Sequence, residues 1–133
     1  MFSFKPLSKS ESDKLFKINE IEITDTSMAV NAINGEDNES YGFCLFDYRD
    51  LTAIVFTLKY SEKFHFLPEC LVKAALNYAA NRGAYIAESS NMSIKKELLD
   101  LGFNQDGDLL TTEIPKIMAG KCCSCNNDNI ERI

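Results

Sequence analysis

The chain has 133 residues, of which 45% are hydrophobic and 26% are charged, and its formal net charge is −6. This length suits one domain, and the composition is that of an ordinary globular protein. The acidic balance argues against a nucleic-acid partner, because binding to DNA or RNA depends on neutralising phosphates with Lys and Arg. No apolar run approaches the roughly 20 residues that cross a bilayer, and Met1–Ser10 has no signal-peptide core. We therefore expect a cytoplasmic protein that binds neither nucleic acid nor membrane.

The first third of the chain predicts a strand, a helix and a segment of ambiguous structure. Apolar residues in Phe2–Leu7 indicate a short strand. Ser8 followed three residues later by Glu11 is a capping-box pattern, which predicts a helix start. The segment Ile21–Asn34 fits either a short helix capped by Ser27 or a strand, and we favour the helix.

The middle of the chain predicts a hairpin. Tyr41–Asp47 and Leu51–Tyr60 are rich in aromatic and β-branched residues, and the few residues between them suit a turn. Strict alternation in the second strand would place one set of side chains on a common face: Ile54, Phe56, Leu58 and Tyr60. The segment Phe64–Leu67 fits either a further short strand or a loop that leads into the next helix.

The stretch Leu67–Phe103 predicts a helix, a strand and a second helix. Pro68 suits the first position of a helix and Gly83 suits its end, and the polar line between them is narrow, so this helix should be mostly buried. The run Ala84–Glu88 indicates a strand on which the helix packs. The second helix would be capped by Ser90, Asn91 or Ser93 and ended by Gly102.

The last part of the predicted domain is a hairpin. Asp106-Gly107 is a tight-turn pair, and the returning strand should stop before Pro115. We expect one domain over residues 1–120, followed by a polar, cysteine-containing tail over 121–133.

The order of these elements resembles that of the GNAT acetyltransferase superfamily over Phe2–Ile114. Leu71-Val72-Lys73-Ala74-Ala75-Leu76 to Gly83 is similar to the family's coenzyme-binding helix, and Asn91 followed by Gly102-Phe103 is similar to its last helix. The fold implied by the resemblance is an α/β (α+β) domain with a mixed, mostly antiparallel sheet and helices on both faces. The implied activity is transfer of an acyl group from acetyl-CoA or another acyl-CoA to an amine.

The resemblance also implies where the coenzyme binds, although the residues depart from the family's pattern. A glycine-rich loop before the helix would hold the pyrophosphate through backbone N–H groups, which are exposed donors at a helix start. Here that loop is Lys63-Phe64-His65-Phe66-Leu67-Pro68 and contains no glycine. The coenzyme-binding candidates are the loop backbone, the first amides of the helix and one later side chain, namely Phe64, Phe66, Leu67, Glu69, Cys70, Leu71 and Asn91.

The catalytic candidates are Glu62 and His65. Either side chain is a candidate general base for the acceptor amine, and His65 is the only histidine, the residue type most often used as a general base. A lone histidine is also often merely structural. In the family a tyrosine seven residues after the Asn protonates the departing thiolate, and that position here is Leu98, which has no proton to donate.

Three cysteines crowd into the tail at Cys122, Cys123 and Cys125. Cys122 and Cys125 have the two-residue gap of zinc and dithiol sites, so the three are candidate ligands for zinc or copper. A structural zinc site uses four ligands, which is more than these three cysteines provide. The competing interpretation is that they are ordinary free thiols with no metal.

Two functions remain open from the sequence. The first is an acyl-CoA-dependent N-acyltransferase with an atypical coenzyme site, acting on a small-molecule or peptide amine. The second is a GNAT-fold binding or interaction module that has lost transfer chemistry, for which a protein partner or a homodimer and a metal-binding thiol tail would be relevant.

Overall fold

The computed structural model describes residues 1–119. The elements along the chain are β1 (Phe2–Pro6), α1 (Lys9–Ile18), β2 (Met28–Asn34), β3 (Ser40–Arg49), β4 (Thr52–Tyr60), α2 (Leu67–Ala80), β5 (Ile86–Ser89), the 3-10 helix η1 (Met92–Ile94), α3 (Lys95–Leu101), β6 (Asn104–Asp106), β7 (Leu109–Glu113) and α4 (Ile114–Met118). None of the helices within residues 1–119 is long and apolar enough to span a bilayer.

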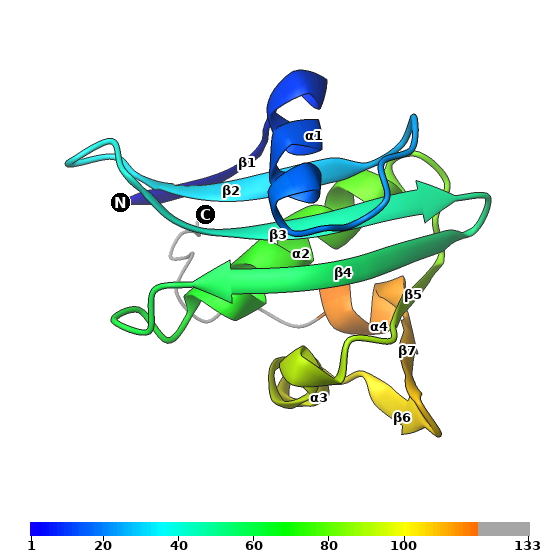
Figure 1. The fold of residues 1–133 in the computed structure, drawn as a ribbon. Helices are drawn as coiled ribbons and strands as arrows, with labels where there is room; N and C mark the ends of the chain where they lie inside the picture. The colour runs from blue at the N-terminus through cyan, green and yellow to red at the C-terminus, as the bar shows by residue number, and fades with distance from the viewer. Residues whose placement is uncertain (120–133) are drawn as a thin grey trace.

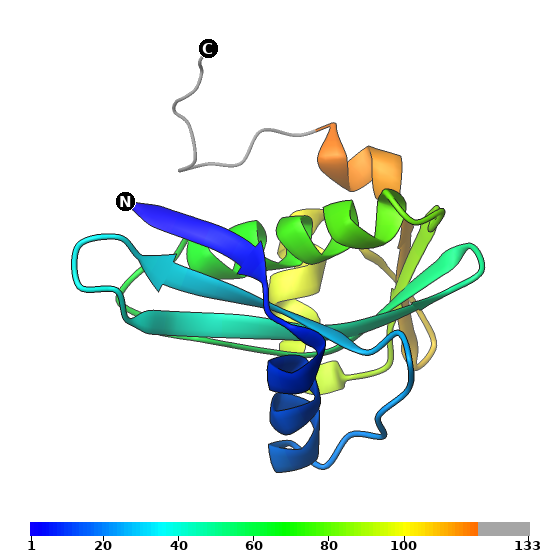
Figure 2. The same cartoon turned by 90° about the horizontal axis from the view of Figure 1, so that it is seen from above.

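The strands form one seven-stranded sheet in the order β1-β2-β3-β4-β5-β7-β6 (Figure 1). Every neighbouring pair is antiparallel except β4 and β5, which run parallel. Helix α1 covers one face of the sheet, and α2 with α4 covers the other (Figure 2). The mixed, mostly antiparallel α/β architecture with helices on both faces that the sequence predicts is therefore confirmed.

Helix α2 contributes several buried apolar residues to the larger core cluster. Leu71, Val72, Ala75 and Leu76 are fully buried against the strands. A second, smaller cluster lies under α1 and contains Phe16. The narrow polar stripe of α2 explains this burial, because a helix with apolar residues around most of its circumference has to pack on more than one layer.

Several local predictions are confirmed at the ends of the elements. The Ser8 side chain accepts a hydrogen bond from the Glu11 N–H at 3.2 Å and caps α1. Gly83 follows α2 with φ 103° and Gly102 ends α3 with φ 114°, which are left-handed conformations that favour glycine. The turn at Gly107 joins β6 to β7, and Pro115 lies in the first turn of α4.

One expectation about secondary structure is wrong, and the structure decides one alternative that the sequence leaves open. The segment that we favoured as a helix from Ser27 is strand β2. Its backbone pairs with both β1 and β3, and most of its apolar side chains are buried. The segment Phe64–Leu67, which fits either a strand or a loop from its sequence, is a pair of turns leading into α2. The Phe64 N–H donates to the Ser61 carbonyl at 3.3 Å, and the Leu67 N–H donates to the Phe64 carbonyl at 3.1 Å.

A β-bulge in β4 overturns the expected alternation of its side chains. Leu45 pairs with Thr57 while Phe46 pairs with Val55, so Phe56 is the extra residue. A bulge of this kind shifts the side chains beyond it to the other face. Leu58 therefore joins the core under α2, whereas the Phe56 ring packs on Phe16 on the α1 side, 5.8 Å between ring centroids.

Candidate functional site

Strands β4 and β5 part soon after they begin, which opens a wedge in the sheet. Their parallel pairing covers three positions, from Thr52 with Ile86 to Ile54 with Glu88. Beyond Ile54, β4 continues to Tyr60 while β5 soon ends at Ser89 (Figure 1). The bulge at Phe56 lies at the point of divergence, where the extra twist that a bulge adds turns β4 away from its neighbour.

Asn91 ties the two sides of the wedge together at its narrow end. Its Nδ2 donates to the carbonyl oxygen of the bulged Phe56 at 2.8 Å. Its Oδ1 accepts from the Ser93 N–H at 3.0 Å and so caps η1. One side chain therefore satisfies an unpaired carbonyl of β4 and fixes the start of the segment that leads into α3.

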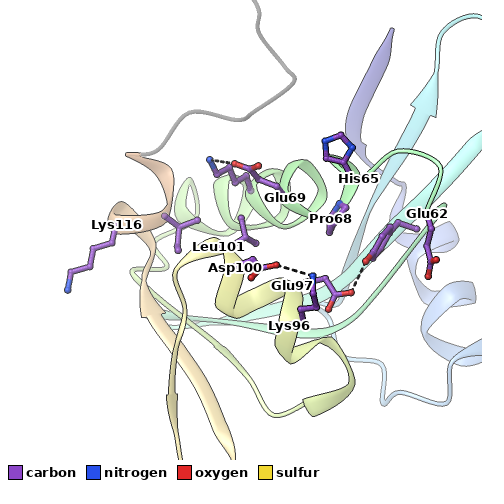
Figure 3. Close-up of a pocket in the computed structure, with 12 residues that line it drawn as sticks. Glu62, His65, Pro68, Glu69, Lys96, Glu97, Asp100, Leu101 and Lys116 are labelled. Atoms are coloured by element: carbon purple, nitrogen blue, oxygen red, sulfur yellow. Dashed lines mark hydrogen bonds and ion pairs between the residues drawn. The ribbon is translucent and has the colours of Figure 1, made fainter.

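The wide end of the wedge opens into a groove of about 510 Å³. It is lined by the end of β4, the loop after it and the helices α2, α3 and α4, with the residues Tyr60, Glu62, His65, Pro68, Glu69, Lys73, Lys96, Glu97, Asp100, Leu101, Lys116 and Ile117. Glu97 and Asp100 project from α3, and Glu69 projects from α2 (Figure 3). Lys116 points away from the other labelled side chains. Apolar surface between the charges comes from Pro68, Leu101 and Ile117.

The charged groups of the groove are largely paired with one another. The Lys73 Nζ lies 3.0 Å from a Glu69 carboxylate oxygen, and the Lys96 Nζ lies 3.3 Å from Asp100. Lys73 is nearly buried, with 9% of the residue exposed. Carboxylates outnumber lysines among the lining residues by four to three, so the groove as a whole offers an anion no net positive field.

A hydrogen bond crosses the groove between β4 and α3. The Tyr60 hydroxyl donates to the Glu97 carboxylate, Oη to Oε2, at 2.7 Å. This bond to Glu97, with partial burial, raises the pKa of Tyr60 to about 12, because the bonded carboxylate favours the protonated phenol.

The two phenylalanines of the loop before α2 do not line the groove. The Phe64 and Phe66 rings pack on Phe2 with centroids 5.0 and 5.4 Å away, and Phe64 also packs on Tyr41 at 5.5 Å. The loop is thus anchored to β1 and β3 through its rings. Because the two rings pack on β1 and β3, they do not fill the mouth of the groove. In a glycine-rich loop the same space is left free because glycine has no side chain.

The remaining predicted site residues lie in two different environments. Glu62, His65 and Glu69 line the groove. The side chains of Leu67, Cys70 and Leu71 are buried, so these residues could contact a ligand only through their backbone groups. The Cys70 N–H donates to the Phe66 carbonyl at 3.2 Å. The catalytic and coenzyme-binding roles of all these residues stay predictions.

Two further positions from the sequence analysis have clear structural settings. Leu98 is fully buried in the core beneath α3. Cys122, Cys123 and Cys125 lie outside the described residues, and within residues 1–119 there is no group of three or more His, Cys, Asp or Glu placed to hold a metal. Zinc or copper binding by the tail stays a prediction.

Sequence reasoning missed the residues that α3 and α4 bring to the groove. Tyr60 and Glu97 are 37 residues apart, and no local pattern connects them. The spacing of Glu97, Asp100 and Leu101 does place all three on one side of a helix, but that spacing alone does not say which element the side faces.

No protein-family model and no curated protein matches the sequence. Solved structures match it in three dimensions. The ribosomal-protein-S18-alanine N-acetyltransferase from Escherichia coli has 14% identity and a TM-score of 0.63, over 86% of this chain and 94% of that one. The PaiA N-acetyltransferase from Thermoplasma acidophilum, solved in complex with coenzyme A, has 11% identity and a TM-score of 0.62, over 85% and 99%.

A third matching structure is of a longer protein, of which this chain spans less than half. The cAMP-binding acyltransferase from Mycobacterium smegmatis has 13% identity and a TM-score of 0.58, and the match covers 88% of this chain but 45% of that one. Identities this low concern the fold alone. The seven-stranded sheet with its single parallel, diverging pair, together with these structural matches, gives this chain the fold of the GNAT N-acetyltransferases.

Proposed function

We propose that this protein binds acetyl-CoA or another acyl-CoA in the groove and transfers the acyl group to an amine of a small molecule or peptide. The observation that carries the proposal is the parting of β4 and β5 beside the start of α2. The parting leaves an edge of β4 without a neighbouring strand and leads into a lined groove. A narrow, amide-bearing chain such as the pantetheine arm fits such an edge, because it can hydrogen-bond to exposed backbone groups.

The phosphates of the coenzyme would lie at the start of α2. A helix N-terminus favours anions through its dipole. In α2 the Leu67 and Cys70 N–H groups already donate to the Phe64 and Phe66 carbonyls, and Pro68 has no N–H, so this part of the proposal rests on the dipole. Lys73 is the lysine of this helix that lines the groove, and Glu69 stands beside it in the first turn. Glu69 therefore opposes phosphate binding, both by its own charge and by neutralising Lys73.

Calorimetry with acetyl-CoA and with CoA tests the binding step. We expect dissociation constants in the micromolar range, whereas binding only at millimolar concentration, or none, would overturn the proposal. Glu69→Gln should tighten binding by about 2- to 5-fold, since one first-turn charge is worth roughly 0.3 to 1 kcal/mol. Glu36→Gln, in the exposed loop after β2 and outside the lining of the groove, makes the same change of charge and should leave the affinity unaltered.

The transfer step would need a base for the acceptor amine and a proton for the thiolate. Glu62 and His65, both at the mouth of the groove, are the candidate bases. Because Leu98 is buried and carries no ionisable proton, we assign protonation of the thiolate to water. Release of free thiol in the presence of primary amines measures the reaction, and we expect the base of the pair to be identified by the larger loss of kcat in Glu62→Gln or His65→Ala.

A second candidate function is a binding or interaction module that uses the same fold without chemistry. It is favoured by the carboxylates of the groove and by Leu98 at the position where the family has a proton donor. Such a module would bind a ligand, a protein partner or a second copy of the chain. Acetyl-CoA binding with no thiol release in the presence of amines would support this alternative and overturn the transferase.

A further inference from the structure

The Tyr60–Glu97 hydrogen bond joins the two walls of the groove. Tyr60 is the last residue of β4, and Glu97 lies in the first turn of α3. Both side chains line the groove, and a dashed line at the labelled Glu97 in Figure 3 marks their bond. At the opposite, narrow end of the wedge the Asn91 side chain makes the corresponding connection to Phe56. The wedge is thus bridged at both ends.

The two bridges differ in what a ligand would do to them. Asn91 makes its bonds to backbone groups of Phe56 and Ser93 and is part of the capping of η1, so breaking them would disturb the fold. Tyr60 and Glu97 bond through their side-chain ends alone, and the Tyr60 hydroxyl and Glu97 carboxylate can rotate apart without moving the backbone. A chain that lies along β4 between the strand and α3 has to separate this second pair.

We propose that the Tyr60–Glu97 bond is a latch across the groove, and that a ligand lying along β4 separates the pair and takes both partners. Once separated, Tyr60 offers one hydroxyl donor and Glu97 offers one carboxylate acceptor. A secondary amide has the complementary set, one carbonyl acceptor and one N–H donor. The ligand group is therefore a secondary amide, which the acyl-pantetheine arm carries; this identification rests on the proposed function.

The latch predicts a characteristic effect of removing the Tyr60 hydroxyl. Tyr60→Phe loses one hydrogen bond in the closed form and one in the bound form, so its effects on the two states nearly cancel. Association should become faster because the groove no longer has to be unlatched, and dissociation should become faster because a contact to the amide is lost. The bond lost in the closed form is to a carboxylate and the bond lost in the bound form is to an amide carbonyl, and each is worth enough to change its rate by about five- to tenfold.

Stopped-flow measurement of acetyl-CoA binding separates the alternatives. We expect the association and dissociation rate constants of Tyr60→Phe to rise together, with the dissociation constant within about threefold of wild type. A rise in dissociation alone would make Tyr60 a simple contact, and unchanged rates would make the bond irrelevant to binding; either result overturns the latch. Tyr41→Phe is the matched control, because it also removes a tyrosine–carboxylate bond, to Asp37, outside the groove.

A second measurement tests the latch without any ligand. Hydrogen exchange of the α3 amides should be faster in Tyr60→Phe by about tenfold, with β1 to β3 unchanged, because α3 loses a tether to β4. Glu97→Gln keeps an acceptor oxygen and should show a smaller increase. Unchanged α3 exchange in Tyr60→Phe overturns the latch. Absence of acetyl-CoA binding in both proteins, with the exchange difference present, instead overturns the proposed coenzyme and leaves the latch standing.

Discussion

Replacing Asn91 tests whether one side chain sets the opening between β4 and β5. Asn91 uses both ends of its carboxamide: Nδ2 donates to the Phe56 carbonyl at 2.8 Å, and Oδ1 accepts from the Ser93 N–H at 3.0 Å. Asn91→Ala removes both bonds. Asn91→Asp keeps the capping oxygen but removes the donor and places a negative charge beside the Phe56 carbonyl.

The magnitudes follow from what each variant leaves without a partner. Loss of a helix cap costs about 1 kcal/mol, and leaving a partly buried carbonyl without a hydrogen bond costs roughly 1 to 3 kcal/mol. Asn91→Ala should therefore lower the free energy of unfolding by about 2 to 4 kcal/mol. Asn91→Asp should lower it by about 1 to 3 kcal/mol, because the cap remains.

Urea unfolding measures these differences as shifts of the midpoint at an unchanged slope. Ser93→Ala is the control. The Ser93 hydroxyl also contacts the Asn91 side chain, at 2.6 Å, but the backbone N–H that Asn91 caps is kept, so we expect a change of about 0.5 kcal/mol or less. If Asn91→Asp were as stable as wild type, the bond to Phe56 would contribute nothing and the reasoning about the wedge would fail.

Three further predictions concern stability. The pKa of Tyr60 in the folded protein is about 12, against an ordinary 10. The bond to Glu97 therefore stabilises the fold fully below pH 10, and this stabilisation is lost as the pH rises from 10 to 12. The difference in unfolding free energy between wild type and Tyr60→Phe should shrink over that range. Gly42→Ala should cost about 2 to 4 kcal/mol in urea unfolding, because the added Cβ would lie 2.6 Å from a backbone oxygen of β4, and an unchanged midpoint would contradict the β3–β4 register. Asp47→Ala should lower the free energy of unfolding by about 3 kcal/mol in thermal unfolding. The fully buried Asp47 carboxylate accepts from the Thr24 hydroxyl at 2.6 Å and from the Tyr48 N–H at 2.7 Å. A wild-type melting temperature would refute that role.

The elements that the sequence predicts well are those with local signals. The Ser8 cap, the Pro68 helix start and the stops at Gly83 and Gly102 each depend on backbone chemistry within a few residues. The failures share a different cause. The segment after Ser27 has a pattern compatible with helix or strand, and pairing with β1 and β3 decides for strand.

The candidate site divides in the same way. The position of the groove could be anticipated, because the loop before α2 and the residue Asn91 follow one another at fixed points of the predicted order of elements. Its lining could not, since Tyr60, Lys73 and Glu97 meet only after β4 diverges and α3 folds back toward α2.

Local chemistry along this chain is enough to specify where several helices begin and end, that α2 is a buried helix, and that the order of elements resembles that of the GNAT fold. Contacts between distant segments determine the rest. The Phe56 bulge depends on which residues of β3 lie opposite, the direction of the Phe64 and Phe66 rings depends on the presence of Phe2, and the Tyr60–Glu97 bond depends on both walls of the wedge. Side-chain direction and charge pairing across a groove are properties of packed neighbours, which sequence spacing does not encode.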